Sequence, residues 1–357
     1  MIKYIGSKRL LVPLITQIAT QAGATTACDM FAGTTRVGQG LKRAGMRVVS
    51  NDLASYSEVL GRAYIEATPD TVDAERLHGL IDELNALPGC RGYFTRTFCE
   101  QARFFQPGNG ERVDAIRDRI DRLDLSPVER GILLTSLMLA ADRVDSTCGV
   151  QMAYVKTWAP RSFKPLVMEM PELVPGPAGS VSRADALDVA PQVADVDLVY
   201  LDPPYNQHSY FSNYHVWETL IRWDAPEPYG VAMKRSDCRT TKSDFNSRRR
   251  AWDALSALVE SLQNPWLVVS FNDEGFHRPE AVLELLAGRG AVASVSVDSR
   301  RYVGAQIGIH DPSGRRVGEV SHLRNREIVW VVGPSDDAVR RAVAGTGSES
   351  GSALAAA

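Results

Sequence analysis

Hydrophobic and polar positions in the first part of the chain follow the order expected of a parallel α/β sheet. Apolar residues recur at helical spacing in residues 10–18, and the apolar run at residues 25–31 indicates a buried strand. A turn at Gly33 then leads into a predicted helix at residues 36–44, which Gly45 ends. Strand, turn and helix in this order predict the start of a doubly wound sheet.

The alternation of strands and helices stops after a second predicted strand at residues 46–50 and a helix at residues 55–66. Residues 70–178 carry helical patterns and turns without an alternating strand pattern, and they end in a run rich in Pro and Gly. The helical patterns lie near residues 73–86, 111–124 and 127–145. We therefore expect residues 70–178 to form an inserted, mostly helical subdomain.

Strand patterns return after residue 179 and complete the predicted sheet. The apolar run at residues 196–201 indicates a buried strand, and the later predicted elements are helix 247–262, strand 266–271, helix 279–287, strand 291–297 and strand 326–332. The last two strands indicate an antiparallel hairpin with a long connection. The catalytic domain then comprises residues 1–69 and 179–334, and residues 335–357, which are small and polar, are expected to form a disordered tail.

Composition narrows the class of protein. Of the 357 residues, 44% are hydrophobic and 23% are charged, as in an ordinary globular protein, and the formal net charge is -3. A nucleic acid would therefore have to bind at a local concentration of basic residues. The five cysteines form no CxxC pair, and the sequence has neither an apolar signal region nor an apolar run long enough to span a bilayer. We expect a cytoplasmic protein with reduced thiols, without a metal site or a membrane anchor.

The tetrapeptide Asp202-Pro203-Pro204-Tyr205 directly follows the predicted strand at residues 196–201. It lies at the carboxyl end of that strand, where open α/β sheets bind ligands. The prolines lack backbone N–H groups, so the neighbouring carbonyls are free acceptors beside the Asp202 carboxylate. Two acceptors at one point suit an amino group with two N–H bonds, and Tyr205 offers a flat face for stacking. Pro-Pro also ends strands in ordinary turns, and that structural interpretation stays open for the tetrapeptide alone.

Such a site suits methyl transfer to an amine. The lone pair of an amino group on an aromatic ring is delocalised, which makes the nitrogen a poor nucleophile. Two acceptors that hold both hydrogens favour a tetrahedral nitrogen that can attack a sulfonium methyl group, and positioning supplies much of the rate. Adenine in DNA, the N4 amine of cytosine, adenine in RNA and a protein amide all remain candidate substrates on this reasoning.

The turn at Gly33 and the acid Asp52 form a second candidate site. A turn of small residues lets the backbone approach a ligand closely, and an acid at the end of the next strand can accept hydrogen bonds from ribose hydroxyls. Turns need glycine in any case, so the position of Asp52 is the stronger indication. A nicotinamide dehydrogenase shares this layout, but the turn lacks the GxGxxG pattern, and hydride transfer gives no reason for the tetrapeptide.

In chain order, these motifs resemble the Dam-like (D12) class of N6-adenine DNA methyltransferases. The resemblance rests on Lys3-Tyr4-Ile5-Gly6-Ser7-Lys8, Asp29-Met30-Phe31-Ala32-Gly33, Asp52 and Asp202-Pro203-Pro204-Tyr205. The stretch from Asn206 to His215 is similar to the extension found in the FokI-type modification methylases. The motifs run from residue 3 to about residue 333, and the family pattern has a second glycine where this chain has Thr35.

The resemblance implies a class I S-adenosylmethionine-dependent methyltransferase fold and a set of cofactor contacts. S-adenosyl-L-methionine would be bound by Tyr4, Lys8, Asp29, Phe31, Gly33, Asp52, Asp185 and Asp202. In that arrangement Lys8 faces the methionine carboxylate, Asp52 holds the ribose and Asp185 approaches the adenine ring. Asp185 is equally well interpreted as a helix cap, and Lys8 as a solvated lysine near the start of a helix.

The resemblance also assigns the catalytic residues Asp202, Pro203, Pro204 and Tyr205. Asp202 and the Pro203 carbonyl would hold the target amine, and Tyr205 would stack on a base flipped out of the duplex. Tyr210, Phe211 and Tyr214 could stack there as well, although we expect Phe211 and Tyr214 to pack against the following helix. Within the family, a leading Asp favours adenine over cytosine.

Basic residues are concentrated between residues 229 and 250, and phosphate contact is the preferred interpretation of this run. The alternative is a solvated loop and helix face. The expected DNA-binding residues are Lys234, Arg235, Arg239, Lys242, Arg248 and Arg249, with Arg250 next to them. Weaker candidates around the final hairpin are Arg300, Arg301, Arg315, Arg316, Arg324 and Arg326, and in the inserted region Lys156, Arg161 and Lys164.

The expected partner is double-stranded DNA, bound by a monomer whose inserted region recognises the target sequence. A restriction–modification system, with a restriction endonuclease as partner, fits the resemblance, but the sequence does not choose between that setting and an orphan or phage-borne enzyme. A non-catalytic nucleic-acid-binding protein on a decayed methyltransferase fold is the alternative from another class. The intact set of Lys8, Asp52 and Asp202 to Tyr205 argues against it.

Overall fold

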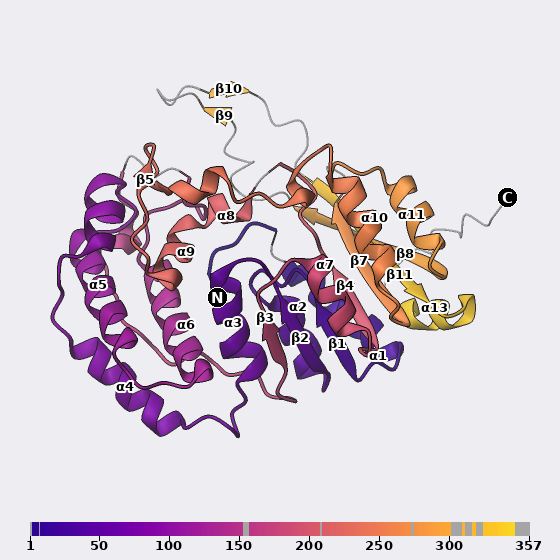
Figure 1. The fold of residues 1–357 in the computed structure, drawn as a ribbon, viewed down its shortest axis with the longest axis horizontal. Coiled ribbons are helices and arrows are strands. Elements are labelled where there is room, and N and C mark those ends of the chain that lie inside the picture. The colour runs from indigo at the N-terminus through magenta and orange to yellow at the C-terminus, as the bar shows by residue number, and fades with distance from the viewer. Residues whose placement is uncertain are drawn as a thin grey trace.

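The computed structural model describes residues 2–6, 8–152, 157–207, 209–272, 275–300, 309–310, 316–318 and 324–346. A seven-stranded sheet with the order β3-β2-β1-β4-β7-β11-β8 forms its centre (Figure 1). The strands are β1 (Thr26–Asp29), β2 (Arg47–Asn51), β3 (Ser180–Ser182), β4 (Leu198–Leu201), β7 (Trp266–Asn272), β8 (Ala291–Arg300) and β11 (Arg324–Gly333). β11 is antiparallel to both of its neighbours, and the other pairings are parallel. The predicted doubly wound sheet with a terminal antiparallel hairpin is confirmed.

Helices cover both faces of the sheet because successive strand residues point to opposite sides. In β4, Leu198 and Tyr200 pack with α1 (Val12–Gln21), α2 (Arg36–Arg43) and α13 (Asp336–Val343). Val199 and Leu201 point the other way, toward α7 (Ala186–Val189), α10 (Ala251–Ser261) and α11 (Pro279–Ala287). All four residues of β4 are buried. The central strand is therefore apolar throughout, as its continuous hydrophobic run predicts.

A helical part adjoins the β3 edge of the sheet, on the left of Figure 1. It contains α3 (Ser55–Gly61), α4 (Ala74–Ala86), α5 (Pro107–Asp121), α6 (Pro127–Arg143) and α9 (His215–Arg222), which share one apolar core. α6 begins with a capping box between Ser126 and Glu129 and is buried on most sides, which explains why its apolar residues do not keep to one stripe. The described part of the inserted region is helical and irregular, and α9 joins its core from beyond residues 202–205.

The remaining elements are short. They are η1 (Lys8–Leu10), η2 (Arg62–Glu66), η3 (Thr95–Gln101), η4 (Pro160–Phe163), η5 (Ala190–Val193), α8 (Tyr210–Asn213), β5 (Pro228–Tyr229), β6 (Lys234–Arg235), η6 (Ser236–Arg239), η7 (Asp244–Asn246), β9 (Ile309–His310) and β10 (Arg316–Gly318). Of these, η2 and η3 are π-helical turns. Among the described residues, no helix has both the length and the apolar character needed to cross a membrane.

The structure differs from the sequence-based predictions at two places, the edge strand β3 and the C-terminal segment. The edge strand β3 was not expected, because its polar sequence Ser180–Ser182 carries no strand pattern. The disordered tail is wrong for Asp336–Val343, which form α13. Ser335 caps this helix, and Val339 and Ala342 are buried beside α1 and β11, so two apolar residues anchor a segment of mostly polar composition. The rest of the predicted tail, from residue 347, lies outside the described residues.

A buried ammonium closes the end of the π-helical turn η2. Lys42 on α2 is 0% exposed, and its Nζ donates to the carbonyls of Tyr64, Ile65 and Ala67 at 3.2, 2.9 and 2.6 Å. Carbonyls at the end of a helical turn have no partner within the turn, so a side chain must supply one. Lys42 therefore joins the first α/β unit to the entrance of the helical part.

We expect Lys42→Met to lower the free energy of unfolding by about 3 kcal/mol, because buried carbonyls lose their donor. Urea denaturation followed by circular dichroism measures this change. Lys164→Met, at an exposed lysine, serves as the control and should stay within about 0.5 kcal/mol of the parent protein. Equal stabilities of the two variants would contradict a capping role for Lys42.

Candidate functional site

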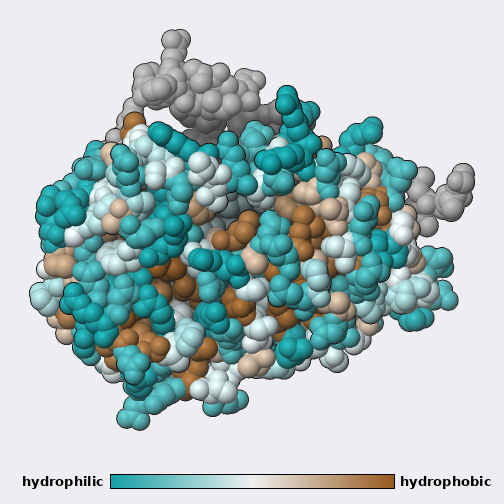
Figure 2. Space-filling model, viewed as in Figure 1, coloured by the Kyte–Doolittle hydropathy of each residue, from teal (hydrophilic) through white to brown (hydrophobic). Residues whose placement is uncertain are grey.

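The carboxyl ends of β1, β2 and β4 meet around a cavity of about 210 Å³. The turn after β1, the acid after β2 and the tetrapeptide after β4 all line it, together with residues from the N-terminal segment and from η7. On the face seen in Figure 2, hydrophobic side chains are concentrated in the middle, over the junction of the helical part and the sheet, between hydrophilic margins. A ligand in the cavity would therefore touch both parts of the molecule.

The structure brings together all the residues predicted to contact the cofactor and all the predicted catalytic residues. The cavity is lined by Tyr4, Lys8, Asp29, Phe31, Gly33, Asp52, Asp185, Asp202, Pro203, Pro204 and Tyr205. Asp185 is also the N-cap of α7 and accepts a hydrogen bond from the Leu187 N–H at 3.0 Å. Asp185 is therefore a helix cap and also part of the cavity lining.

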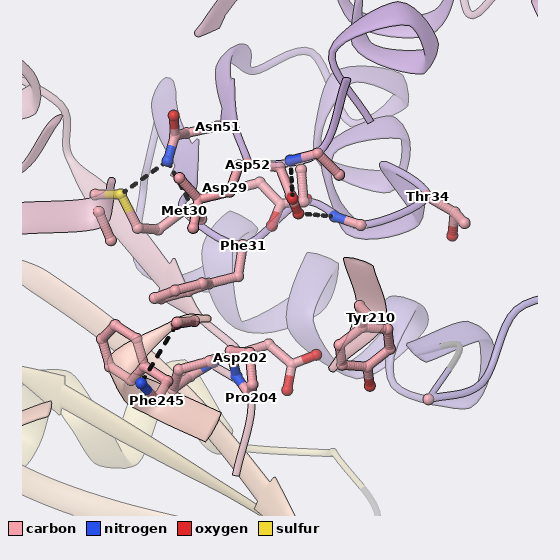
Figure 3. Close-up of a pocket in the computed structure, with 18 of the residues that line it drawn as sticks. Asp29, Met30, Phe31, Thr34, Asn51, Asp52, Asp202, Pro204, Tyr210 and Phe245 are labelled. Carbon is pink, nitrogen blue, oxygen red and sulfur yellow. Dashed lines mark hydrogen bonds between the residues drawn. The ribbon is translucent and has the colours of Figure 1, made fainter. Parts of the chain in front are cut away.

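Two carboxylates hold the turn that lines the cavity. Asp52 accepts the backbone N–H of Gly33 at 2.8 Å and that of Ala54 at 2.9 Å (Figure 3). Asp29 accepts the N–H of Gly38 near the start of α2 at 3.0 Å. These bonds satisfy donors that a helix start and a tight turn would otherwise leave unpaired. The turn is therefore fixed before a ligand arrives.

Glycine is required at Gly33, and the backbone favours glycine at Thr35. Gly33 has φ +51°, and a Cβ there would lie 3.3 Å from the Tyr4 ring. Thr35 also adopts a left-handed conformation, with φ 59°. Its hydroxyl donates to the Thr34 carbonyl at 2.7 Å and accepts from the Gln39 side chain at 2.9 Å, and these bonds offset the strain. The family's glycine at this position thus has a conformational reason.

Lys8 lies between two carboxylates. Its Nζ is 3.1 Å from Asp202 Oδ1 and 3.0 Å from Glu327 Oε2, and its side chain is 8% exposed. The nitrogen is also 5.5 Å from the centroid of the Tyr205 ring. The alternative of a solvated lysine is excluded by this burial. Lys8 instead neutralises the carboxylate that leads the tetrapeptide.

Burial shifts the acid–base properties of the site. It raises the pKa of Asp202 to about 6, with the Lys8 ammonium acting in the opposite direction and Glu327 in the same one. It raises the pKa of Asp29 to about 7, and it also raises that of Asp52, in both cases against backbone N–H donors. For Lys8, burial lowers the pKa, but the carboxylates and tyrosines around it prevail and raise it well above the usual value. Lys8 thus stays charged.

A stack of tyrosines connects the N-terminal segment to the helical part. The Tyr4 ring stacks on Tyr214 at 4.6 Å and on Tyr210 at 5.3 Å between centroids. The Tyr214 hydroxyl accepts the backbone N–H of Ile5 at 2.6 Å. Tyr214 is 1% exposed, which confirms the expected packing role, and Tyr210 lines the cavity. The segment that carries Lys8 is therefore held in place by residues that follow the tetrapeptide.

Tyr205 is fixed from the neighbouring strand. Asn272, at the end of β7, donates from Nδ2 to the Tyr205 hydroxyl at 3.1 Å, and Phe271 packs against the ring with centroids 5.8 Å apart. Across the cavity, Phe31 meets Phe245 edge to face at 5.1 Å. In the view of Figure 3, Asp29 and Asp52 lie on one side of Phe31, and Asp202 and Tyr210 lie on the other. In this view Phe31 thus lies between an upper half of the site, with Asp29 and Asp52, and a lower half, with Asp202 and Tyr210.

Several site residues were missed in the sequence. Asn51 donates to the Met30 and Ala184 carbonyls at 3.2 and 3.1 Å and so ties two strand ends together. Its place next to Asp52 at a strand end was an available signal. Asn272, Phe245 and Glu327 stand in stretches that gave no motif. The positions of Asn272 and Glu327 depend on strand pairing, and the position of Phe245 depends on the path of a loop. The spacing of residues along the sequence shows neither.

The basic run divides into exposed and buried members. Lys242, Arg248 and Arg249 are exposed, and Lys234 is half-buried. Arg239 is exposed and stacks on Tyr229, with its guanidinium 4.1 Å from the ring centroid. The run therefore presents charges to solvent near the segment that supplies Phe245 to the cavity.

The predicted DNA contact at Arg235 is contradicted by its burial. Its side chain is 1% exposed, and its guanidinium donates to Asp224, Asp237 and Thr219 at 2.6–3.3 Å. These bonds use all five of its N–H groups, which leaves none for a phosphate. A charge run in the sequence does not show which arginine folds inward.

The other arginine and lysine candidates have varied positions. Arg161 donates to Asp145 and to the Thr147 carbonyl at 2.9 and 2.7 Å, so it is engaged within the inserted region. Lys164 and Arg326 are exposed. The backbone at Lys156, Arg301 and Arg315, and the side chains of Arg300, Arg316 and Arg324, lie outside the described residues.

Comparisons with known proteins agree with the geometry. Residues 4–272 match the model of the family described as D12 class N6 adenine-specific DNA methyltransferase. The chain is 30% identical to the type II methyltransferase M.NlaIII of Neisseria lactamica, over 84% of this chain and 92% of that protein. It is 25% identical to M.CviAII of Paramecium bursaria Chlorella virus 1, over 84% of this chain and 92% of that protein. M.FokI of Planomicrobium okeanokoites is 28% identical over 81% of this chain but 47% of its own length. The predicted family is confirmed.

We expect Arg235→Met to lower the free energy of unfolding by about 2–3 kcal/mol, because Asp224 and Asp237 lose a shared partner and are only partly hydrated. Arg249→Met removes an exposed guanidinium and should change stability by less than about 0.5 kcal/mol. Chemical denaturation of both variants measures the difference. If Arg235→Met is as stable as the parent protein, the ion pairs of Arg235 do not hold it inside, and it is again a candidate phosphate contact.

Proposed function

Because the chain belongs to the D12 class of N6-adenine-specific DNA methyltransferases, we propose that it is a site-specific enzyme that methylates adenine N6 in duplex DNA. The observation that supports this most is the partly buried Asp202 carboxylate at the cavity, beside Pro203 and the fixed ring of Tyr205. A duplex base cannot reach this point while it is stacked, so the target adenine has to flip out.

Asp202 and Pro203 are the proposed acceptors for the target amine. The ionised Asp202 carboxylate accepts one N–H of the base, and the Pro203 carbonyl accepts the other. Among the described residues, no donor reaches that carbonyl, so it is available. Tyr205 stacks on the base, and its hydroxyl bond to Asn272 keeps the ring from turning away. These residues thus orient the amine nitrogen and lower the free energy needed to make it tetrahedral. None of them serves as a strong base.

The upper half of the cavity fits S-adenosyl-L-methionine, which supplies an electrophilic methyl group on a sulfonium when it is bound. Four carboxylates, one ammonium and one guanidinium line the cavity, and this excess of negative charge favours a ligand that carries a sulfonium and an ammonium. Asp52 would accept ribose hydroxyls on lone pairs that its backbone bonds leave free, and Phe31 and Asp185 would lie by the adenine of the cofactor. Gly33 leaves space that a Cβ would fill. Lys8 is the proposed partner of the methionine carboxylate.

DNA is proposed to lie across the basic run and the inserted helical region. Lys242, Arg248 and Arg249 are exposed and would contact phosphates, while the inserted region at residues 70–178 would read the target sequence. The relatives M.NlaIII and M.FokI are named type II methyltransferases. We therefore infer a modification methylase that acts as a monomer, with a restriction endonuclease of the same specificity as its partner.

Asp202→Ala tests the catalytic proposal. We expect it to abolish methyl transfer, by at least about a thousandfold, because the amine loses its charged acceptor, while the protein keeps its fold. The assay follows transfer of labelled methyl groups from S-adenosylmethionine to DNA from a host without methylases, with nucleoside analysis of the product. Near-normal activity of a folded Asp202→Ala variant would overturn the role of Asp202. A product other than N6-methyladenine from the parent protein would overturn the substrate.

The pH dependence tests the same carboxylate. Its pKa is raised to about 6 by burial, so the acceptor is ionised above this pH and becomes protonated as the pH falls through it. We expect the single-turnover rate to fall about tenfold per pH unit below about 6. Asp202→Asn cannot titrate, so its lower residual rate should lack this acid limb. An unchanged limb in Asp202→Asn would assign the limb to another group.

Gly33→Ala tests the fit of the cofactor. We expect it to raise the dissociation constant of S-adenosylmethionine about tenfold or more, because the left-handed backbone is strained and the new methyl group presses on Tyr4. Gly45→Ala is a matched control, since Gly45 has φ +93° but no atom within 4 Å of a Cβ. It should lose stability without a change in cofactor affinity, as measured by calorimetry. Equal affinities of the two variants would show that the turn does not border the cofactor.

A further inference from the structure

Glu327 is a partly buried acid next to the proposed catalytic tetrapeptide, and it belongs to none of the sequence motifs. Its carboxylate contacts Lys8 Nζ at 3.0 Å, and its side chain is 15% exposed. We propose that Glu327 is a positioning residue, which draws the Lys8 ammonium away from Asp202 when the target amine binds. This inference rests on the proposed function, because it concerns the acceptor that the adenine amine uses.

The proposal follows from a competition for one carboxylate. Asp202 Oδ1 already accepts from Lys8 at 3.1 Å and from the Ser270 hydroxyl at 3.2 Å. An adenine amine that binds to Asp202 has to share the negative charge of this carboxylate with the ammonium, even if it binds to the other oxygen. A weaker bond between Lys8 and Asp202 makes the carboxylate a better acceptor, but a mostly buried ammonium needs a counterion. Glu327 supplies one from the protein side, beside the methionine carboxylate proposed for the cofactor, so the ammonium stays paired when it moves away from Asp202.

Strand pairing fixes Glu327 at this place. In the antiparallel pair of β7 and β11, Glu327 lies opposite Asn272. Asn272 holds the Tyr205 hydroxyl, and Lys8 lies 5.5 Å from the centre of the same ring. The pairing of Glu327 with Asn272 in the sheet therefore positions two groups. Asn272 holds the Tyr205 ring, and Glu327 is the counterion of the Lys8 ammonium above that ring. Side chains on paired strands keep such a geometry better than side chains on loops do.

The charge of Glu327 also acts on Asp202 itself. It raises the pKa of that carboxyl, in addition to burial, while Lys8 and the Ser270 hydroxyl lower it. The other ionisable groups whose charges couple to Asp202 are Asp29, Tyr200 and Tyr210. Removal of the Glu327 charge alone should therefore move the acid limb of activity to lower pH.

The experiment uses Glu327→Gln, which keeps the shape of the side chain and removes its charge. DNA affinity is measured on two duplexes that contain the sequence methylated by the parent protein, one with the target adenine and one with purine, which lacks the amine. We expect an affinity loss of about tenfold for the adenine duplex and none for the purine duplex. Glu284→Gln, at an exposed position on α11, is the charge-matched control and should change neither value.

A double-mutant cycle separates an action through Lys8 from a general structural role. In a Lys8→Met background, Glu327→Gln should no longer weaken binding of the adenine duplex, because the ammonium is gone. The acid limb of the Glu327→Gln single variant should lie at lower pH than that of the parent. Equal losses on both duplexes, additive effects in the cycle, or an unmoved acid limb would each overturn the role of Glu327. If the parent protein methylates no adenine, the proposed function fails first, and that outcome is distinct from failure of this inference.

Discussion

The candidate active site depends on the convergence of three strand ends on one small cavity. Parallel pairing of β1 with β2 and β4 brings the carboxylates of Asp29, Asp52 and Asp202 to the same edge of the sheet. Burial works against their charges, as the raised pKa values of all three show. Backbone N–H groups stabilise Asp29 and Asp52, and the Lys8 ammonium stabilises Asp202. The fold thus concentrates negative charge where a cationic methyl donor and an amine are proposed to meet.

The N-terminal segment and the helical part also meet at the cavity. Lys8 can reach Asp202 because the ring of Tyr4, earlier in the same segment, stacks on both Tyr210 and Tyr214. These tyrosines belong to the start of the segment that runs into α9, which shares its core with α5 and α6. A helical part that recognises a sequence would therefore be coupled mechanically to Lys8 through aromatic packing, without a separate signal.

Much of the site could be predicted from the sequence, because its residues stand at the ends of apolar strands. Asp29, Asp52 and Asp202 each stand at the end of such a strand, and strand order alone places them together. Glu327 could not be found in this way, since its role depends on the antiparallel register of β11 against β7. Arg235 was assigned wrongly because its partner Asp224 is visible only in the folded chain. The helix α13 escaped prediction because two apolar residues suffice to anchor it.

The central claim is that the Asp202 site holds adenine in a defined DNA sequence. Single-molecule sequencing of DNA from a methylase-free host that expresses the protein tests this claim most directly, because it reports the modified base and its context together. We expect N6-methyladenine at one short sequence in cells with the parent protein and none in cells with Asp202→Ala. N4-methylcytosine at that sequence, or unmodified DNA in cells that contain the folded parent protein, would contradict it.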